Sequence, residues 1–87
     1  MFWKSKTTKE KLTEEIASMY QNTIKLALKE SSESFMQATY LRMAIKTCND
    51  TARNHAPRLA RKYNMALEDV WRVIADCHDA ANKYFLE

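Results

Sequence analysis

The stretch ALEDVWRVIADCHDAANKYF, residues 66–85, decides the fold class that the chain predicts. Apolar side chains recur in it at the spacing of one face of an α-helix, and charged side chains occupy the opposite face. The predicted stripe consists of Leu67, Val70, Trp71, Val73, Ile74, Cys77, His78, Ala81, Tyr84 and Phe85. Glu68 and Asp69 open the stretch, where the helix dipole favours negative charge. We therefore expect a long C-terminal helix that packs through one face.

The preceding segment, NHAPRLARKYN at residues 54–64, contains the only proline of the sequence. Proline disfavours the helical conformation at the residue before it and suits the first turn of a new helix. We therefore expect a break near Pro57 and a short helix over residues 58–63. Asn64 tolerates a left-handed backbone conformation and is expected to form the next turn.

Two longer amphipathic helices are predicted before this break. Thr7, with Glu10 three residues later, matches a capping box and is the expected start of the first. The serines of SSES, residues 31–34, are expected to end it and to cap the second. The main apolar positions are Leu12, Ile16, Met19, Tyr20, Ile24 and Leu28 in the first helix, and Met36, Tyr40, Leu41, Met43, Ile45, Cys48 and Ala52 in the second. Each apolar face spans about 200°, which is wider than a helix with one neighbour needs.

The sequence has no glycine among its 87 residues. Phosphate-binding loops, dinucleotide-binding folds and nucleophile elbows all need backbone freedom that glycine supplies, so its absence argues against all three. The length predicts a single domain over residues 1–87, with residues 1–6 a loose basic lead-in. The predicted fold is an all-α bundle of three or four helices: two long, one short after Pro57, and one long at the C-terminus.

Cysteine and histidine positions give no sign of a metal or catalytic site. Cys48, His55, Cys77 and His78 lack the paired spacing of zinc ligands. Neighbouring residues on a helix point about 100° apart, so Cys77, His78 and Asp79 cannot line up as nucleophile, base and orienting group. We expect no metal, no cofactor and no enzymatic activity. Unpaired cysteines favour a reducing, cytoplasmic setting, and no apolar run approaches the ~20 residues of a membrane span.

Charge is unevenly distributed, although the net charge is only +3. The basic side chains of the middle segment form a candidate binding stripe for a partner or for phosphates: Arg42, Lys46, Arg53, Arg58, Arg61 and Lys62. The exposed side of the C-terminal helix is a candidate partner-facing acidic surface: Glu68, Asp69, Asp76 and Asp79. A solvated basic stripe remains an alternative. Because one chain carries both surfaces, self-association is the simplest interpretation.

Residues 59–74 resemble the helix-turn-helix of phage and bacterial repressors. Ala60 stands at the small position of that motif, and Asn64 stands where the motif usually has glycine. Tyr63, Met65, Val70 and Val73 stand at its apolar packing positions. The resemblance implies a regulatory nucleic-acid-binding protein that uses residues 57–77, helped by the basic stripe. The carboxylates of the would-be recognition helix argue against this, because they would face phosphates.

Two functions from different classes therefore follow from the sequence. The favoured one is a small cytoplasmic helical interaction or adaptor module, homodimeric, that acts through helix faces and complementary charge. The wide apolar faces and the segregated charge motivate it. The alternative is the helix-turn-helix-like nucleic-acid-binding protein.

Overall fold

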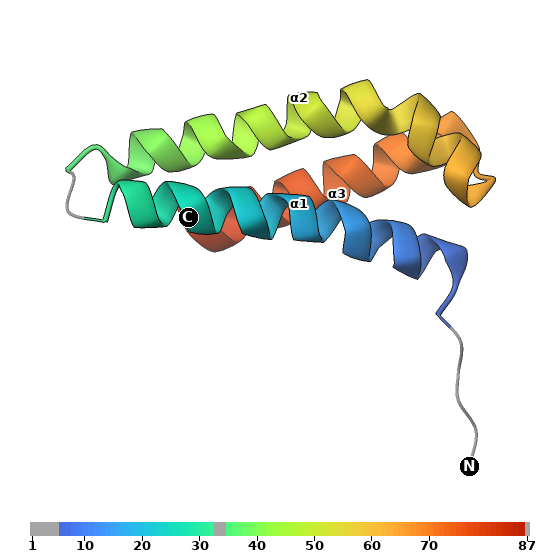
Figure 1. Ribbon diagram of the computed structural model, residues 1–87, viewed down its shortest axis with the longest axis horizontal. Helices are drawn as coiled ribbons and strands as arrows, with labels where there is room; N and C mark the ends of the chain where they lie inside the picture. Colours follow the sequence, from blue (N-terminus) through green and yellow to red (C-terminus); the bar gives the residue numbers. More distant parts are fainter. Residues whose placement is uncertain (1–5, 33–34, 87) are drawn as a thin grey trace, which may run out of the picture.

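The computed structural model describes residues 6–32 and 35–86, and within these ranges the chain forms three helices and no strand. They are α1 (Thr8–Glu30), α2 (Gln37–Tyr63) and α3 (Leu67–Leu86). Each helix packs against both others. The chain runs along α1, returns along α2 and runs back along α3, so α1 and α3 are parallel and α2 is antiparallel to both (Figure 1). The all-α prediction is confirmed. The expected lead-in at residues 1–6 lies outside the described residues except for Lys6.

The start of α1 and the end of α2 are capped as the sequence predicts. The Thr7 hydroxyl oxygen accepts a hydrogen bond from the Glu10 backbone N–H at 3.1 Å. Asn64 adopts a left-handed conformation, with φ 51° and ψ 51°. The Met65 N–H then reaches back to the carbonyl of Ala60 at 2.9 Å, which satisfies one of the last carbonyls of α2.

The predicted break at Pro57 and the separate short helix over residues 58–63 are wrong, because α2 continues through Pro57 to Tyr63. The proline ring has no N–H to give to the carbonyl four residues earlier, which costs about 3 kcal/mol inside a helix. Ala56 and Leu59, on either side of Pro57, are almost completely buried, while Pro57 itself faces solvent. Packing on both sides therefore holds α2 in one piece, and the helix bends toward its C-terminal end (Figure 1).

The serines between α1 and α2 end α1 as predicted, but among the described residues none of them caps α2. Ser34 lies outside the described residues, and the N-cap of α2 is Met36, which makes no capping hydrogen bond through its side chain. Ser31 instead caps the end of α1, where its hydroxyl donates to the carbonyl of Ala27 at 2.5 Å and is buried. A serine can donate to a carbonyl one turn earlier, and this bond serves the end of α1.

The core lies along the common axis of the three helices. Its most deeply buried apolar side chains are Leu12, Ile16 and Ile24 of α1, Ile45, Ala52, Ala56 and Leu59 of α2, and Val70, Val73 and Ile74 of α3. Trp71 and Tyr84, which the sequence places in the buried stripe of α3, are 44% and 80% exposed. Trp71 lies about 100° round α3 from the centre of its buried residues, whereas Tyr84 lies only about 40° from that centre but in the last turn of the helix. Among the described helices, none is both long and apolar enough to cross a membrane.

Candidate functional site

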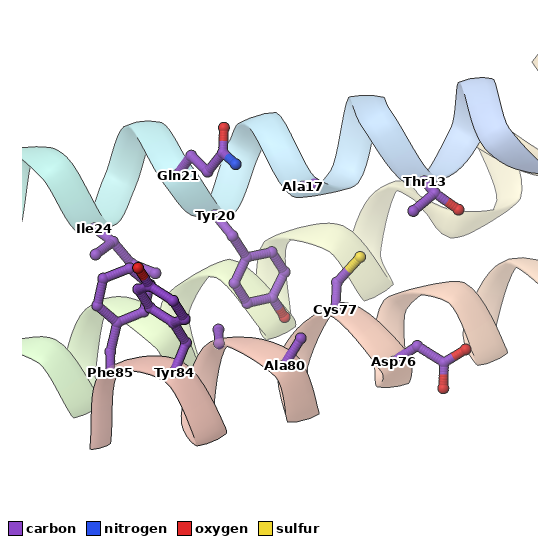
Figure 2. Close-up of a pocket in the computed structure, with 11 residues that line it drawn as sticks. Thr13, Ala17, Tyr20, Gln21, Ile24, Asp76, Cys77, Ala80, Tyr84 and Phe85 are labelled. Carbon is purple, nitrogen blue, oxygen red and sulfur yellow. The ribbon is translucent and has the colours of Figure 1, made fainter. Parts of the chain in front are cut away.

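A groove of about 540 Å³ lies between α1 and α3. Its lining residues are Thr13, Ala17, Tyr20, Gln21 and Ile24 of α1, and Asp76, Cys77, Ala80, Ala81, Tyr84 and Phe85 of α3. Figure 2 shows Tyr84 and Phe85 at one end, beneath Ile24, and Asp76 toward the other end. The groove is open because small side chains, Ala17, Ala80 and Ala81, stand where the helices face each other. A volume of this size with a mostly apolar lining is typical of a binding surface.

One polar group in the groove lacks the partner that a buried group normally has. The Tyr20 side chain is only 3% exposed, and within the described part of the chain its hydroxyl has no hydrogen-bond partner. Burial raises the pKa of the Tyr20 phenol, so the hydroxyl keeps its proton at neutral pH. An unpaired buried hydroxyl costs about 1–3 kcal/mol. The Tyr20 hydroxyl is therefore a polar atom at the wall of the groove that the described part of the chain leaves without a partner.

His78 is the neighbour of Tyr20 on the inner side of the bundle. Its ring stands edge-on to the Tyr20 ring, with the ring centroids 6.4 Å apart. In the same described ranges the His78 Nδ1 atom is also buried without a hydrogen-bond partner. Two side chains that each carry a buried polar atom without a partner thus stand edge-on to each other between α1 and α3, an arrangement that sequence spacing alone does not reveal.

Burial limits the reactivity of both cysteine thiols, since Cys48 is buried and Cys77 is half-buried. Burial raises the pKa of the Cys77 thiol, with a smaller contribution from the adjacent Asp76 carboxylate. A raised pKa makes a poor nucleophile, because the thiolate is the reactive form. Cys48 is buried and donates to the Met19 carbonyl at 3.7 Å. Within residues 6–32 and 35–86, no three His, Cys, Asp or Glu side chains are grouped so that they could hold a metal ion.

The exposed aromatic ring beside the groove belongs to Tyr84. It packs edge-on against Phe85, with the ring centroids 4.8 Å apart, and is otherwise 80% exposed. An aromatic side chain of this size that stands free in solvent is a common anchor in protein interfaces. The α1–α3 face therefore presents a hollow and a projecting ring next to each other.

The six basic residues predicted as a binding stripe are all exposed, but they do not share one face. Arg42, Lys46 and Arg53 lie within about 40° of one another on α2. Arg58 and Lys62 lie about 120–180° farther round the helix, and Arg61 lies between the two groups. Lys46 is paired with Asp50 at 3.0 Å, and Lys62 with Glu15 at 2.6 Å. The structure thus divides the stripe and pairs two of its members within the chain.

Glu15 forms the polar link between α1 and α2. Its carboxylate accepts hydrogen bonds from the Lys62 ammonium at 2.6 Å and from the Tyr63 hydroxyl at 2.7 Å. These two bonds hold the pKa of Glu15 below its usual value, with a smaller contribution from the nearby charge of Arg58. Sequence patterns do not reveal this contact, because it joins residues almost fifty positions apart.

The predicted acidic surface keeps its place on the outside of α3. Glu68, Asp69, Asp76 and Asp79 are all exposed, and they lie within about 100° of one another on the helix. Asp69 approaches Arg72 at 3.8 Å, and Asp76 borders the groove. The acidic surface and the groove therefore adjoin along α3.

The α2–α3 junction carries the residues that resemble a helix-turn-helix. Asn64 makes the turn and Val70 and Val73 are buried, as packing positions should be. However, α3 returns antiparallel along α2 (Figure 1), whereas the two helices of the DNA-binding motif cross at about 90–120°.

Comparison of the chain with protein-family models, with curated proteins and with solved structures gave no match.

Proposed function

We propose that the protein is a protein–protein interaction module that forms a homodimer through its α1–α3 face. The observation that carries the proposal is the presence on this face of both an apolar groove and an exposed aromatic ring, Tyr84. A twofold dimer uses the same surface on both copies, so the surface must complement itself. A hollow and a projecting ring side by side meet this condition, since the ring of each copy can enter the groove of the other.

The charges along α3 support an antiparallel approach of the two copies. Asp76 and Lys83 are exposed and stand on either side of Ala80, four and three residues away. If the two α3 helices cross antiparallel near Ala80, Asp76 of each copy lies beside Lys83 of the partner subunit. The arrangement therefore makes two equivalent ion pairs at the edge of the apolar contact.

The Tyr20 hydroxyl, which has no hydrogen-bond partner among the described residues, supports the same antiparallel dimer. A tyrosine ring that enters the groove carries its own hydroxyl into the apolar site, and that oxygen can accept a hydrogen bond from Tyr20. Pairing of the two hydroxyls removes the cost of leaving Tyr20 unpaired, which a purely apolar occupant would not do.

Sedimentation equilibrium over a range of protein concentrations tests the proposal. The wild-type chain should dimerise, and Ala80→Arg should be monomeric at concentrations where the wild type is a dimer, because it places a charged side chain in the groove. Ala75→Arg is the matched control: Ala75 is also an exposed alanine of α3, but it lines a different, smaller hollow beside α2. A wild-type chain that stays monomeric throughout, or an Ala80→Arg variant that dimerises as the wild type does, would overturn the proposal.

Charge exchange tests the antiparallel geometry. Asp76→Lys and Lys83→Asp should each weaken the dimer, because each places like charges side by side. The double variant should restore much of the affinity, since the pair is then re-formed with its signs reversed. Two single changes whose effects simply add in the double variant would show that these residues do not meet.

Nucleic-acid binding stays a prediction of the sequence. A duplex DNA titration at low and moderate salt tests it, because phosphate contacts give an affinity that falls as salt rises. We expect no measurable affinity at low salt, since α3 presents carboxylates where a recognition helix presents donors.

A further inference from the structure

We propose that the end of the α1–α2 hairpin binds the surface of anionic lipid bilayers through an apolar strip that has basic side chains on both sides. Seven large apolar side chains are exposed among the described residues, and five of them lie between positions 26 and 43: Leu26, Phe35, Met36, Tyr40 and Met43. Leu26 lies near the end of α1, Phe35 and Met36 lie directly before α2, and Tyr40 and Met43 lie in its first turns. Exposed apolar side chains gathered in one place mark an interaction surface.

The strip is continuous over the two helices. Met36, Tyr40 and Met43 are spaced so that they lie within about 60° of one another along α2. Leu26 lies on the same edge of α1 as Glu15, the residue that contacts α2. Because α1 and α2 are antiparallel, the last turns of α1, which include Leu26, run beside the first turns of α2 (Figure 1). Leu26, Met36, Tyr40 and Met43 are referred to below as the apolar strip.

Basic side chains flank the apolar strip on both helices. Lys25 and Lys29 lie on the side of α1 away from α2, and Arg42 and Lys46 lie on the opposite side of the strip, along α2. All four are exposed. Among the described residues the exposed carboxylates nearby are Glu30 and Asp50, and Asp50 pairs with Lys46 and offsets its charge, so Lys25, Lys29 and Arg42 supply most of the basic character. The surface is therefore apolar in the middle and basic at both edges.

An anionic bilayer is the occupant that this pattern fits. Apolar side chains enter the boundary between headgroups and acyl chains, while lysine and arginine at the edges extend toward anionic headgroups. A second copy of the chain fits poorly, because a twofold contact through this surface would bring the same basic edges face to face. The helices lie on the membrane and do not cross it, in keeping with their composition.

This surface is separate from the proposed dimer face. Leu26 and the groove residue Ala17 are about 180° apart around α1. A dimer formed through the groove would leave the apolar strip of each copy accessible, so the two proposals can fail independently.

Co-sedimentation of the full chain with lipid vesicles tests the inference. We expect binding to mixed phosphatidylcholine–phosphatidylserine vesicles, weaker binding at high salt, and little binding to vesicles of phosphatidylcholine alone. Arg42→Glu and Met43→Ser should each lower the partition coefficient by about tenfold, the first through charge and the second through lost apolar insertion. Circular dichroism confirms that each variant keeps its helices.

Two control variants make the same chemical changes elsewhere. Arg61→Glu reverses a charge at the far end of α2, and Trp71→Ser removes an exposed apolar side chain of α3. Both should bind phosphatidylserine vesicles as the wild type does. Equal binding to both vesicle types, no binding to either, or the same loss in Arg61→Glu as in Arg42→Glu would each overturn the proposal. Retained binding in Met43→Ser would also overturn it, because the strip would then not enter the bilayer.

Discussion

Glu15 is the residue at which polar contacts join α1 to α2. The Lys62 ammonium and the Tyr63 hydroxyl both donate to its carboxylate, and the pKa of Glu15 is lowered as a result. A carboxyl group whose pKa is lower in the folded state contributes stability that is present above its unfolded pKa. That contribution is lost as the pH falls through the lowered pKa of the folded state. The link should therefore matter near neutral pH and vanish in acid.

Glu15→Gln should accordingly lower the free energy of unfolding at neutral pH and have little effect in acid, because the wild-type carboxyl is then protonated as well. Urea unfolding at a series of pH values measures the difference. Glu14→Gln is the control, since Glu14 contacts only the exposed Lys6 among the ion pairs described. A difference between Glu15→Gln and the wild type that does not change with pH would show that the carboxylate charge is not what stabilises the contact.

Asn64 occupies a backbone position that glycine would adopt with less strain, so the absence of glycine lowers the stability of the fold there. Its backbone is left-handed, a conformation that is unfavourable for residues with a β-carbon and less so for asparagine. Asn64→Gly should raise the free energy of unfolding by up to about 1 kcal/mol, and Asn64→Ala should lower it by about 1 kcal/mol. Thermal unfolding of both variants measures the effect. Equal stability in the two variants would contradict the left-handed assignment.

At the scale of the element, α2 shows where sequence patterns succeed and where they fail. Its end at Asn64 follows from local rules and is observed, whereas Met36, Tyr40 and Met43, which the sequence places on its apolar face, are exposed. Its passage through Pro57 does not follow from local rules, because burial of Ala56 and Leu59 against other helices decides it. The cap at Thr7 was predictable for the converse reason, since every atom involved lies within one turn.

Pro57→Ala tests this account of α2. The alanine N–H can donate to the carbonyl of Arg53, and the position is exposed, so nothing in the core has to repack. We expect the free energy of unfolding to rise by about 1–3 kcal/mol, reduced somewhat because the unfolded chain gains freedom when proline is removed. Urea unfolding measures it. A fall in stability would mean that the bend introduced by proline is needed for α2 to contact both neighbours.

At the scale of the whole molecule, the groove depends on how far apart α1 and α3 stand. The sequence indicated that each apolar face was too wide for a helix with one neighbour, and each helix does contact both others. It could not show which apolar side chains stay uncovered, those of the groove beside Ala80 and those of the strip around Tyr40. Which ones stay uncovered depends on the angles at which the three helices pack against one another. The distribution of the basic residues around α2 was not predicted for another reason: it depends on α2 continuing through Pro57, which places Arg58 and Lys62 in the same helix as Arg42.

Tyr20 connects the interior of the single chain to its proposed assembly. Its hydroxyl is unpaired in the isolated chain, so Tyr20→Phe should leave the stability of the monomer unchanged or raise it slightly. In the proposed dimer the same hydroxyl donates to Tyr84 of the partner subunit, so Tyr20→Phe should weaken dimerisation by about tenfold. The unfolding midpoint of the wild type should rise with protein concentration, because only the folded chain dimerises, and that rise should be smaller in the variant. Measuring unfolding of both proteins at low and high concentration separates the two effects. A variant that is destabilised at low concentration, with an undiminished dependence on concentration, would show that Tyr20 serves the core of the monomer and not the dimer.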